Sequence, residues 1–439
     1  MTVIDTAQAA DSPFARALAS GELKDVEVSF TDHQGHMCGK RIPGARMGAG
    51  AKIAFCSAAL AWDYNGDVHD GTSITGPESG YPDAFLRPDP SGFRWLPWRE
   101  GAGHVISDVV DRHGDLLAQA PRTVLRRAIE RIAALGYTVR MGVEIEMYLL
   151  DADNRPLSTG VHCYSLQKAN DLEPAASAIL LELGDFVRLE GGNVEYGPGQ
   201  WEVNLAHDEA LAAADQGVRL KYGVREMARR AGVKATFMAK PFNKLSGSSM
   251  HLHVSLWKDG QPAFAPENDA ENPLMRSALG GLIRHLPGIA LYGSPTVNSY
   301  KRFERDSFAP VNVSWGGDNR TVAIRSLIES PNATRIELRT PASDANPYWA
   351  AAGMLTAIAV GIEDNDDPGK RGEGYLYGVG EQLPTTLGDG IVAARADTRI
   401  VELLGQQAVD DLLLLSGKEW QAFTTQVSAW DIDRYLGAI

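Results

Sequence analysis

Apolar and polar residues alternate along three segments of the chain, a pattern typical of strands that bury one face. In GVEIEMY (142–148), the alternation places Glu144 and Glu146 opposite the valine, isoleucine and methionine. In SSMHLHVSLW (248–257) it places His251 and His253 on one face, and in TRIELRT (334–340) Glu337 shares a face with two arginines. The pattern predicts three strands whose polar faces carry acids, histidines and arginines.

The remaining pattern predicts a small β-rich part followed by a larger part in which helices and strands alternate. Valine, phenylalanine and isoleucine alternate with polar residues in 23–43, which indicates two strands around a turn at 33–35. Helical spacing runs through 120–137 and is expected to end at Gly136. Further helices are expected over 208–231, 273–288 and 419–436. We place the boundary near residues 112–121 and expect domains at 14–111 and 118–439.

Composition narrows the function classes. The chain has 439 residues and a formal net charge of −14, so nucleic acid and anionic membranes are disfavoured as main partners. The three cysteines, Cys38, Cys56 and Cys163, show no paired spacing, which argues against a disulfide framework or a zinc site. The sequence shows no signal-peptide pattern and no long apolar run, so we expect a cytoplasmic protein.

Acidic residues are crowded in the predicted strands. EYGPGQWEVN (195–204) adds Glu195 and Glu202 on either side of a Pro-Gly turn. For any one strand alone, an ordinary polar outer face is the better explanation. Together, however, the carboxylates would repel one another unless a cation neutralised them. Hard divalent cations prefer carboxylate oxygens and tolerate imidazole, so the set predicts Mg²⁺ or Mn²⁺.

Positive charge gathers in the second half of the chain. Arg302, Arg320, Arg325, Arg335 and Arg339 lie within 40 residues of this acidic protein, and arginine binds carboxylate and phosphate through a fixed fork of donors. For any one of them a surface ion pair is an equal alternative. The Walker A pattern is missing, so metals and arginines would have to hold any phosphate. The combination points to phosphoryl transfer onto a carboxylate.

At this point the chain resembles the glutamine synthetase family. The resemblance is carried, in order, by GVEIEMYLLD, EYGPGQWEVN, KATFMAKPF, GSSMHLHVSL, NSYKRF, DNRTVAIR and RIELRTPASDANPY. It implies an α+β fold with an N-terminal β-grasp domain and a larger catalytic domain built on a curved antiparallel sheet. It also implies a homo-oligomeric ring, usually a dodecamer, with each active site between two subunits.

The resemblance assigns roles position by position. The first metal is expected at Glu146, Glu195 and Glu202, and the second at Glu144, His251 and Glu337. ATP is expected at Glu190, His253, Ser255, Arg325 and Arg335. Glutamate and the transferring phosphoryl group are expected at Gly247, Arg302, Arg320 and Arg339. The implied reaction forms γ-glutamyl phosphate from glutamate and ATP, and an amine then displaces phosphate.

The sequence departs from the ammonia-using members at two places. Phe308 stands where they carry a glutamate, and Cys56 stands where they carry an aspartate. An ammonium ion gains little in a pocket without anions, whereas an alkyl or aryl amine gains from apolar walls. We expect these walls from Phe308, Cys56, Trp62, Tyr64 and Trp315, although Trp62 and Tyr64 could equally be packing residues. Ser246 replaces the asparagine often found in the glutamate-side loop.

The sequence therefore predicts an ATP-dependent ligase that joins glutamate to a primary amine other than ammonia. Three alternatives stay open. The first is a glutamine synthetase proper, in which Glu304 or Asp306 removes the proton. The second is a non-catalytic ring of the same fold, and the third is a ligase that activates a different carboxylate.

Overall fold

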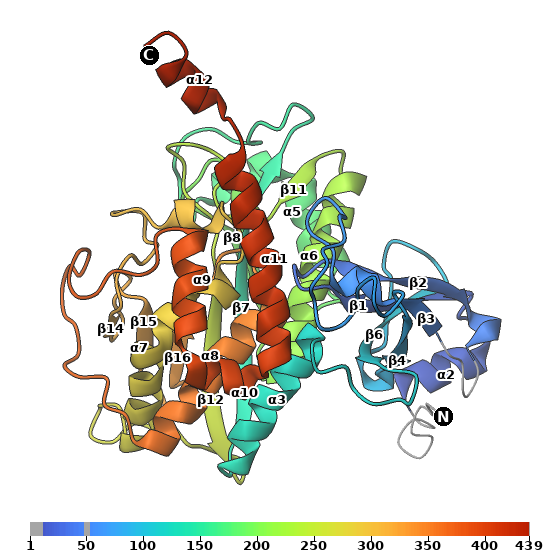
Figure 1. Cartoon of the computed structure of the whole chain (residues 1–439), viewed down its shortest axis with the longest axis horizontal. Helices are drawn as coiled ribbons and strands as arrows, with labels where there is room; N and C mark the ends of the chain where they lie inside the picture. Colours follow the sequence, from blue (N-terminus) through green and yellow to red (C-terminus); the bar gives the residue numbers. More distant parts are fainter. Residues whose placement is uncertain (1–11, 48–52, 439) are drawn as a thin grey trace.

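The alternating pattern near the N-terminus forms a mixed six-stranded sheet in the computed structural model, which describes residues 12–47 and 53–438 (Figure 1). Its strands lie in the order β2-β1-β6-β4-β3, with β5 also paired to β6. Strands β1 and β6 run parallel, and the other pairs are antiparallel. The bounds are β1 (Asp25–Thr31), β2 (Met37–Pro43), β3 (Ile53–Cys56), β4 (Asp83–Pro88), β5 (Arg94–Trp95) and β6 (Ala102–Val110).

This first sheet has its own hydrophobic core. Val26 and Val28 of β1 are fully buried, and Phe14 of α2 (Pro13–Ser20) packs into the same cluster. The β1–β2 pairing places Thr31 opposite Met37, so the predicted turn at 33–35 is correct. A separate core supports our proposal that 14–111 and 118–439 are two domains, and the β-grasp class of the first stays a prediction.

A second, ten-stranded sheet forms the centre of the larger part of the chain. Its main path is β14-β15-β16-β12-β7-β9-β8, and β14–β15 is the parallel pair in that path. The bounds are β7 (Thr138–Leu150), β8 (Leu189–Val194), β9 (Gln200–Leu205), β10 (Asp208–Glu209), β11 (Lys234–Thr236), β12 (Met250–Lys258), β13 (Gln261–Pro262), β14 (Trp315–Gly316), β15 (Ile324–Leu327) and β16 (Arg335–Leu338).

Helices bury the apolar back of this sheet. α3 and α6 pack against β7, and α8 packs against α3, α6 and α7 (Figure 1). Val143 and Ile145 of β7 are buried in the same cluster as residues of these helices, so the alternating acids of β7 point the other way. The bounds are α3 (Pro121–Ala134), α4 (Leu166–Ala169), α5 (Ala175–Ser177), α6 (Ala210–Arg230), α7 (Pro273–Gly293), α8 (Pro347–Asp364), α9 (Leu387–Ala396), α10 (Thr398–Leu404), α11 (Gln406–Thr425) and α12 (Ala429–Tyr435).

The predicted closing helix over 419–436 is wrong as a single helix. α11 ends at Thr425, Gln426 is extended (φ −76°, ψ 127°), and a new helix starts after Ser428. Ser428 and Asp431 form a reciprocal capping box, which satisfies the first free amides of α12. No helix in the described ranges combines the length and apolar character needed to cross a bilayer.

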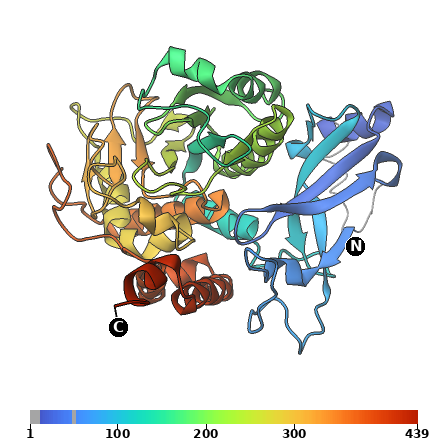
Figure 2. The ribbon, with the colours of Figure 1, turned by 90° about the horizontal axis from the view of Figure 1, so that it is seen from above.

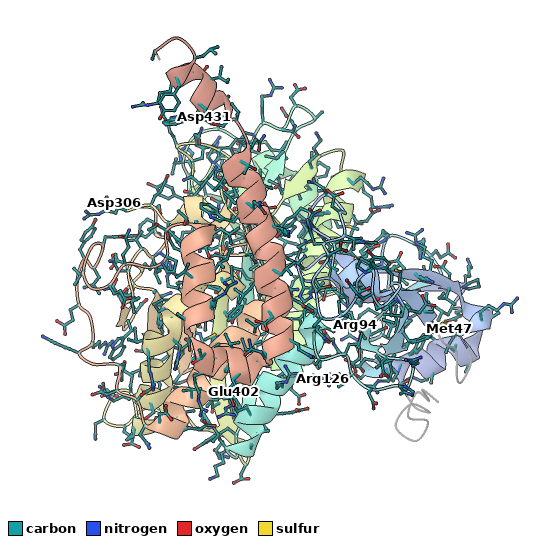
Figure 3. The ribbon with its side chains drawn as sticks, in the orientation of Figure 1. Met47, Arg94, Arg126, Asp306, Glu402 and Asp431 are labelled. Atoms are coloured by element: carbon teal, nitrogen blue, oxygen red, sulfur yellow. The ribbon has the colours of Figure 1, made fainter. Side chains whose placement is uncertain are left out.

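A buried ion network joins the two parts of the molecule. Viewed from above, the first sheet stands beside the larger part (Figure 2). Arg122 of α3 forms ion pairs with Asp89 and Asp108 from the first part and with Asp215 of α6. Arg126 adds a second pair to Asp108 and lies at this junction in Figure 3.

Candidate active site

Strand register brings the predicted site residues together on the face of the larger sheet opposite its helices. Antiparallel pairing places His251 of β12 opposite Glu144 of β7 and places His253 opposite Glu337 of β16. On the other side of β7, Glu146 lies opposite Glu202 of β9, and Glu195 follows the end of β8. The predicted acids and histidines therefore share one sheet face.

A cavity of about 630 Å³ lies over this face. It is polar in the centre and carries arginines and aromatic side chains at its walls. Of the predicted residues, it is lined by Glu144, Glu146, Glu195, Glu202, Gly247, His251, His253, Arg302, Phe308, Arg320, Arg325, Arg335 and Arg339. Glu337 lies beneath it and is fully buried.

Three carboxylates, Glu146, Glu195 and Glu202, form an acidic group in the cavity. Burial, together with the charges of Glu195 and Glu202, raises the pKa of Glu146 well above its usual value. Burial and the nearby charges of Glu144 and Glu195 raise the pKa of Glu202 to about 8. Glu146 still accepts hydrogen bonds from the Ser249 amide (2.8 Å) and from Gln200 Nε2 (3.1 Å). These mutually destabilised carboxylates suit a bound cation.

A second group joins Glu144, His251 and Glu337. His251 Nδ1 lies 3.3 Å from Glu144 Oε2 and 3.6 Å from Glu337 Oε1. Burial alone would raise the pKa of Glu337, but Arg339, the two histidines and Arg325 together lower it to about 2. Arg325 and Arg339 donate to its two oxygens at 2.5 and 2.7 Å. A metal ligated by Glu337 would therefore have to displace or share these arginine contacts.

The donor chemistry of both groups fits hard divalent cations, because glutamate oxygens dominate and one imidazole joins them. Within residues 12–47 and 53–438, no group of three or more His, Cys, Asp or Glu side chains is already arranged to hold a metal ion. The metal assignments accordingly stay predictions.

The predicted glutamate-side residues form a buried support beside the acidic group. Arg302 is 1% exposed and donates to Ser249 Oγ (3.1 Å) and to the Thr340 carbonyl (2.5 Å). Gly247 must be glycine, since a Cβ there would lie 2.4 Å from Arg302 Cγ. Arg320, by contrast, is exposed at the cavity wall.

The predicted nucleotide residues extend into an adjacent cavity of about 270 Å³. Ser255 and the exposed Glu190 line this second cavity, while His253 and Arg335 line both. Arg335 Nε donates to His253 Nδ1 at 3.3 Å. Because His253 and Arg335 border both, the second cavity adjoins the first on the side of Ser255.

The predicted amine pocket is only partly formed within one chain. Phe308 lines the main cavity, is 51% exposed and packs edge-on against Tyr196 with ring centroids 6.2 Å apart. Cys56, Trp62 and Tyr64 lie in the first part of the molecule and do not line this cavity, so the single-chain pocket excludes them.

The assignment of Trp315 to the amine pocket is wrong. Trp315 is 3% exposed, donates to the Pro368 carbonyl and packs under the guanidinium of Arg276. It is a packing residue, because it belongs to β14 at the edge of the sheet and its ring points into the core.

Sequence reasoning missed several cavity residues. Gln200 is 1% exposed, and its Nε2 donates to Glu146 and to the carbonyl of Gly247, so it links the acidic group to the glutamate-side loop. Its place directly after the Pro-Gly turn, as the first residue of β9, was the available signal. Cys163, Tyr164 and Tyr196 also line the cavity, and no period-two pattern marks them.

Comparisons with known proteins show to which family the chain belongs. Residues 118–435 match the family described as glutamine synthetase, catalytic domain. The chain belongs to the glutamine synthetase family. It is therefore an ATP-dependent C–N ligase, as are its named relatives.

Relatives named as glutamate–amine ligases and relatives named as glutamine synthetases match this chain at similar sequence identity. The glutamate–isopropylamine ligase of Pseudomonas sp. is 36% identical over 403 residues, which cover 87% of each chain. The gamma-glutamylethanolamide synthetase of Streptomyces coelicolor is 34% identical, covering 95% of this chain and 93% of its own. The glutamine synthetase of Halobacterium salinarum is 35% identical, covering 94% and 93%. Sequence identity alone therefore does not indicate which amine this protein uses.

A solved structure titled GmaS/ADP complex has the same fold. It superposes with a TM-score of 0.86 and 30% sequence identity, and the match covers 97% of this chain and 99% of that one. The α+β architecture with a glutamine-synthetase catalytic domain is thereby confirmed.

Proposed function

We propose that the protein joins the γ-carboxylate of L-glutamate to a primary amine other than ammonia. The observation that carries the proposal is the position of Phe308. A half-exposed aromatic ring forms the cavity wall there, against Tyr196, at the sequence position where ammonia-using members carry an acid. An ammonium ion would gain no ion pair from this ring, whereas an apolar substituent would bury surface on it.

The two acids proposed as substitutes in a glutamine synthetase proper are engaged elsewhere. Glu304 accepts from Lys240 Nζ at 2.7 Å. Asp306 accepts from Tyr375 at 2.6 Å and lies at the outer edge of the molecule in Figure 3. Neither lines the main cavity. This arrangement favours the amine ligase over the ammonia alternative.

The residues support a two-step reaction. In the first step, glutamate would lie beside Gly247 and Arg302, and its γ-carboxylate would attack the terminal phosphate of ATP, which lies towards Ser255. Arg339 and Arg320 line the same cavity and would stabilise the charge of the phosphoryl group as it moves. Mg²⁺ or Mn²⁺ ions held by the two residue clusters described above would neutralise the rest of the negative charge on the phosphoryl group.

In the second step, the amine attacks the acyl carbon of γ-glutamyl phosphate, and phosphate leaves. We propose that the nitrogen enters between Phe308 and the acidic group, so that its substituent rests on the ring. The proton that the amine nitrogen loses would leave with the departing phosphate.

We further propose a ring assembly, with the dodecamer as the expected size. Cys56, Trp62 and Tyr64 would then complete the amine pocket from a neighbouring subunit, since their own chain does not bring them to its cavity. Ring size is measured by native mass spectrometry, and a monomer would contradict this part of the proposal.

Steady-state phosphate release with glutamate, ATP, Mg²⁺ and a panel of amines tests the function. The panel contains ammonia, a small alkylamine, an alkanolamine, a polyamine and an aniline. We expect at least one organic amine to exceed ammonia in kcat/KM. The proposal is wrong if ammonia has the highest kcat/KM, and a non-catalytic ring is indicated if no amine supports ATP turnover.

A further inference from the structure

A separate cavity of about 170 Å³ lies at the junction of the two parts of the molecule. The turn between β1 and β2 contributes Gln34, Gly35 and His36, and the loop after β3 contributes Tyr64. The larger part contributes two residues of α6, the segment 235–238 and Asp344. None of these residues lines the cavity described above for glutamate and ATP.

Lys221 of α6 is a buried cation that faces this cavity. It is 4% exposed, and its Nζ donates one hydrogen bond, to the Ala345 carbonyl at 2.5 Å. An ammonium group has three donors, so two are left over. Burial and the charge of Arg225 lower the pKa of Lys221 to about 7, and Asp344 offsets this only in part.

Arg225, one helical turn further along α6, adds a second positive charge. Its guanidinium lies 5.0 Å from the ring centre of Phe237, and the Lys221 ammonium lies 5.8 Å from the same ring. In the part of the chain that the structure describes, no carboxylate oxygen lies within 4.0 Å of either group. Lys221, the buried member of the two, therefore lacks the ion pair that buried cations in proteins usually have.

The other polar groups are consistent with an anion that also carries a donor. Asp344 lines the cavity, but its carboxylate already accepts hydrogen bonds from Thr296 (2.8 Å) and Ser299 (2.9 Å). Gln34 donates to the Trp62 carbonyl, and its Oε1 is buried without a partner. Ala235, Phe237 and Met238 leave an apolar wall that suits a short carbon chain.

We propose that this junction cavity binds the carboxylate of a small organic acid or amino acid, with Lys221 and Arg225 as its cationic partners. Phosphate is a poorer fit, because the apolar wall would contact one of its oxygens. Its lining shares no residue with the cavity proposed for glutamate and ATP, and Tyr64 is the one lining residue that also belongs to the proposed amine pocket.

Thermal unfolding of the full-length protein tests the site. The additives are sodium propionate, alanine and ethylammonium chloride, each at the same ionic strength as a sodium chloride reference. We expect propionate and alanine to raise the unfolding temperature by about 2–4 °C at near-saturating concentration, and ethylammonium to have no effect. A larger shift with alanine assigns the site to amino acids, and an equal or smaller one assigns it to simple acids.

Three variants test whether the shift in unfolding temperature comes from this cavity. Lys221→Met and Arg225→Gln should lose the shift, whereas Arg230→Gln, which removes the same charge from an exposed position on α6, should keep it. Lys221→Met should unfold at or above the wild-type temperature without additive, since it removes a buried unpaired charge. Because Arg225 is exposed, Arg225→Gln provides the test even if Lys221→Met does not fold.

Two results would overturn the proposal. One is the absence of any carboxylate-dependent shift in the wild-type protein. The other is a shift that persists in Arg225→Gln or Lys221→Met, which would place the binding at the glutamate site or elsewhere.

Discussion

Phe308 has a left-handed backbone conformation (φ 59°), and Arg339 donates to its carbonyl at 3.1 Å. The loop therefore holds this side chain at the cavity wall. Phe308→Glu would place a carboxylate where ammonia-using members have one. At about 4 Å a carboxylate and an ammonium attract by about 4 kcal/mol near a protein surface, part of which desolvation removes. We expect kcat/KM for ammonia to rise roughly tenfold, measured as glutamine formed.

The matched control is Phe308→Leu, which keeps an apolar wall without a charge. It should not raise kcat/KM for ammonia. It should lower kcat/KM for organic amines, because the smaller side chain offers them less contact area. If both variants changed glutamine formation equally, the carboxylate would not be the cause, and Phe308 would not select the nucleophile.

Glu202 tests the cation-binding role of the acidic group. Glu202→Gln keeps the size of the side chain and removes one of the charges that cluster with Glu146 and Glu195. Mg²⁺ should raise the unfolding temperature of the wild-type protein, and this rise should largely disappear in the variant. Above pH 8, where Glu202 is ionised, the metal-free variant should be no less stable than the wild type, because like-charge repulsion is relieved.

Glu329→Gln serves as the comparison for this measurement. Glu329 lines the same cavity but pairs with Arg335 at 3.1 Å and is not a predicted metal ligand. It should retain the Mg²⁺-dependent rise. An unchanged rise in Glu202→Gln would remove Glu202 from the metal site.

At the scale of elements, helix α8 depends on its N-cap residue, Asn346. Asn346 Oδ1 accepts from the Tyr348 amide at 3.0 Å, which caps the helix, and Nδ2 donates to the carbonyls of Asp32 and His33 in the first part. Asn346→Ala loses the cap and both of these contacts. We expect the free energy of unfolding in urea to fall by about 2 kcal/mol.

Ser428→Ala is the contrasting cap variant. Ser428 begins α12, which buries none of its residues, so its loss should change global stability by less than about 0.5 kcal/mol. Equal losses in the two variants would mean that the contacts with Asp32 and His33 add nothing beyond helix capping.

Strand parity predicted much of the site because side chains alternate with a fixed period. It placed Glu144 with Glu146, and His251 with His253, on faces whose backs are buried in the core. Parity within a strand says nothing about register between strands, so the pairing of Glu146 with Glu202 was known only from the structure. The break between α11 and α12 was missed because the apolar spacing continues across it.

At the scale of the whole molecule, Arg122 holds the two parts together. It is 4% exposed and contacts three aspartates, Asp89, Asp108 and Asp215. Arg122→Met would leave the buried carboxylate of Asp215 without its ion-pair partner, and we expect the free energy of unfolding to fall by about 3–5 kcal/mol in denaturant titration. Arg155→Met, which removes an exposed arginine paired with Asp151 and Asp153, should cost less than about 1 kcal/mol.

The two-part organisation followed from composition and turn residues, but the contacts between the parts did not. Asp108 and Asp215 are far apart in sequence and meet only through Arg122. Likewise, Trp62 and Tyr64 were assigned to the amine pocket by residue type, yet their own chain places them away from Phe308. Long-range placement depends on packing between elements, which local patterns do not encode.

The central claim is that an organic amine, not ammonia, is the preferred nucleophile. A competition reaction tests it most directly: the enzyme is given glutamate, ATP, Mg²⁺, ammonia and the best organic amine of the panel at equal amine concentrations. The two amides are then counted by mass spectrometry. Their initial ratio equals the ratio of the two kcat/KM values. We predict that the γ-glutamyl amide of the organic amine exceeds glutamine, and an excess of glutamine would contradict the account.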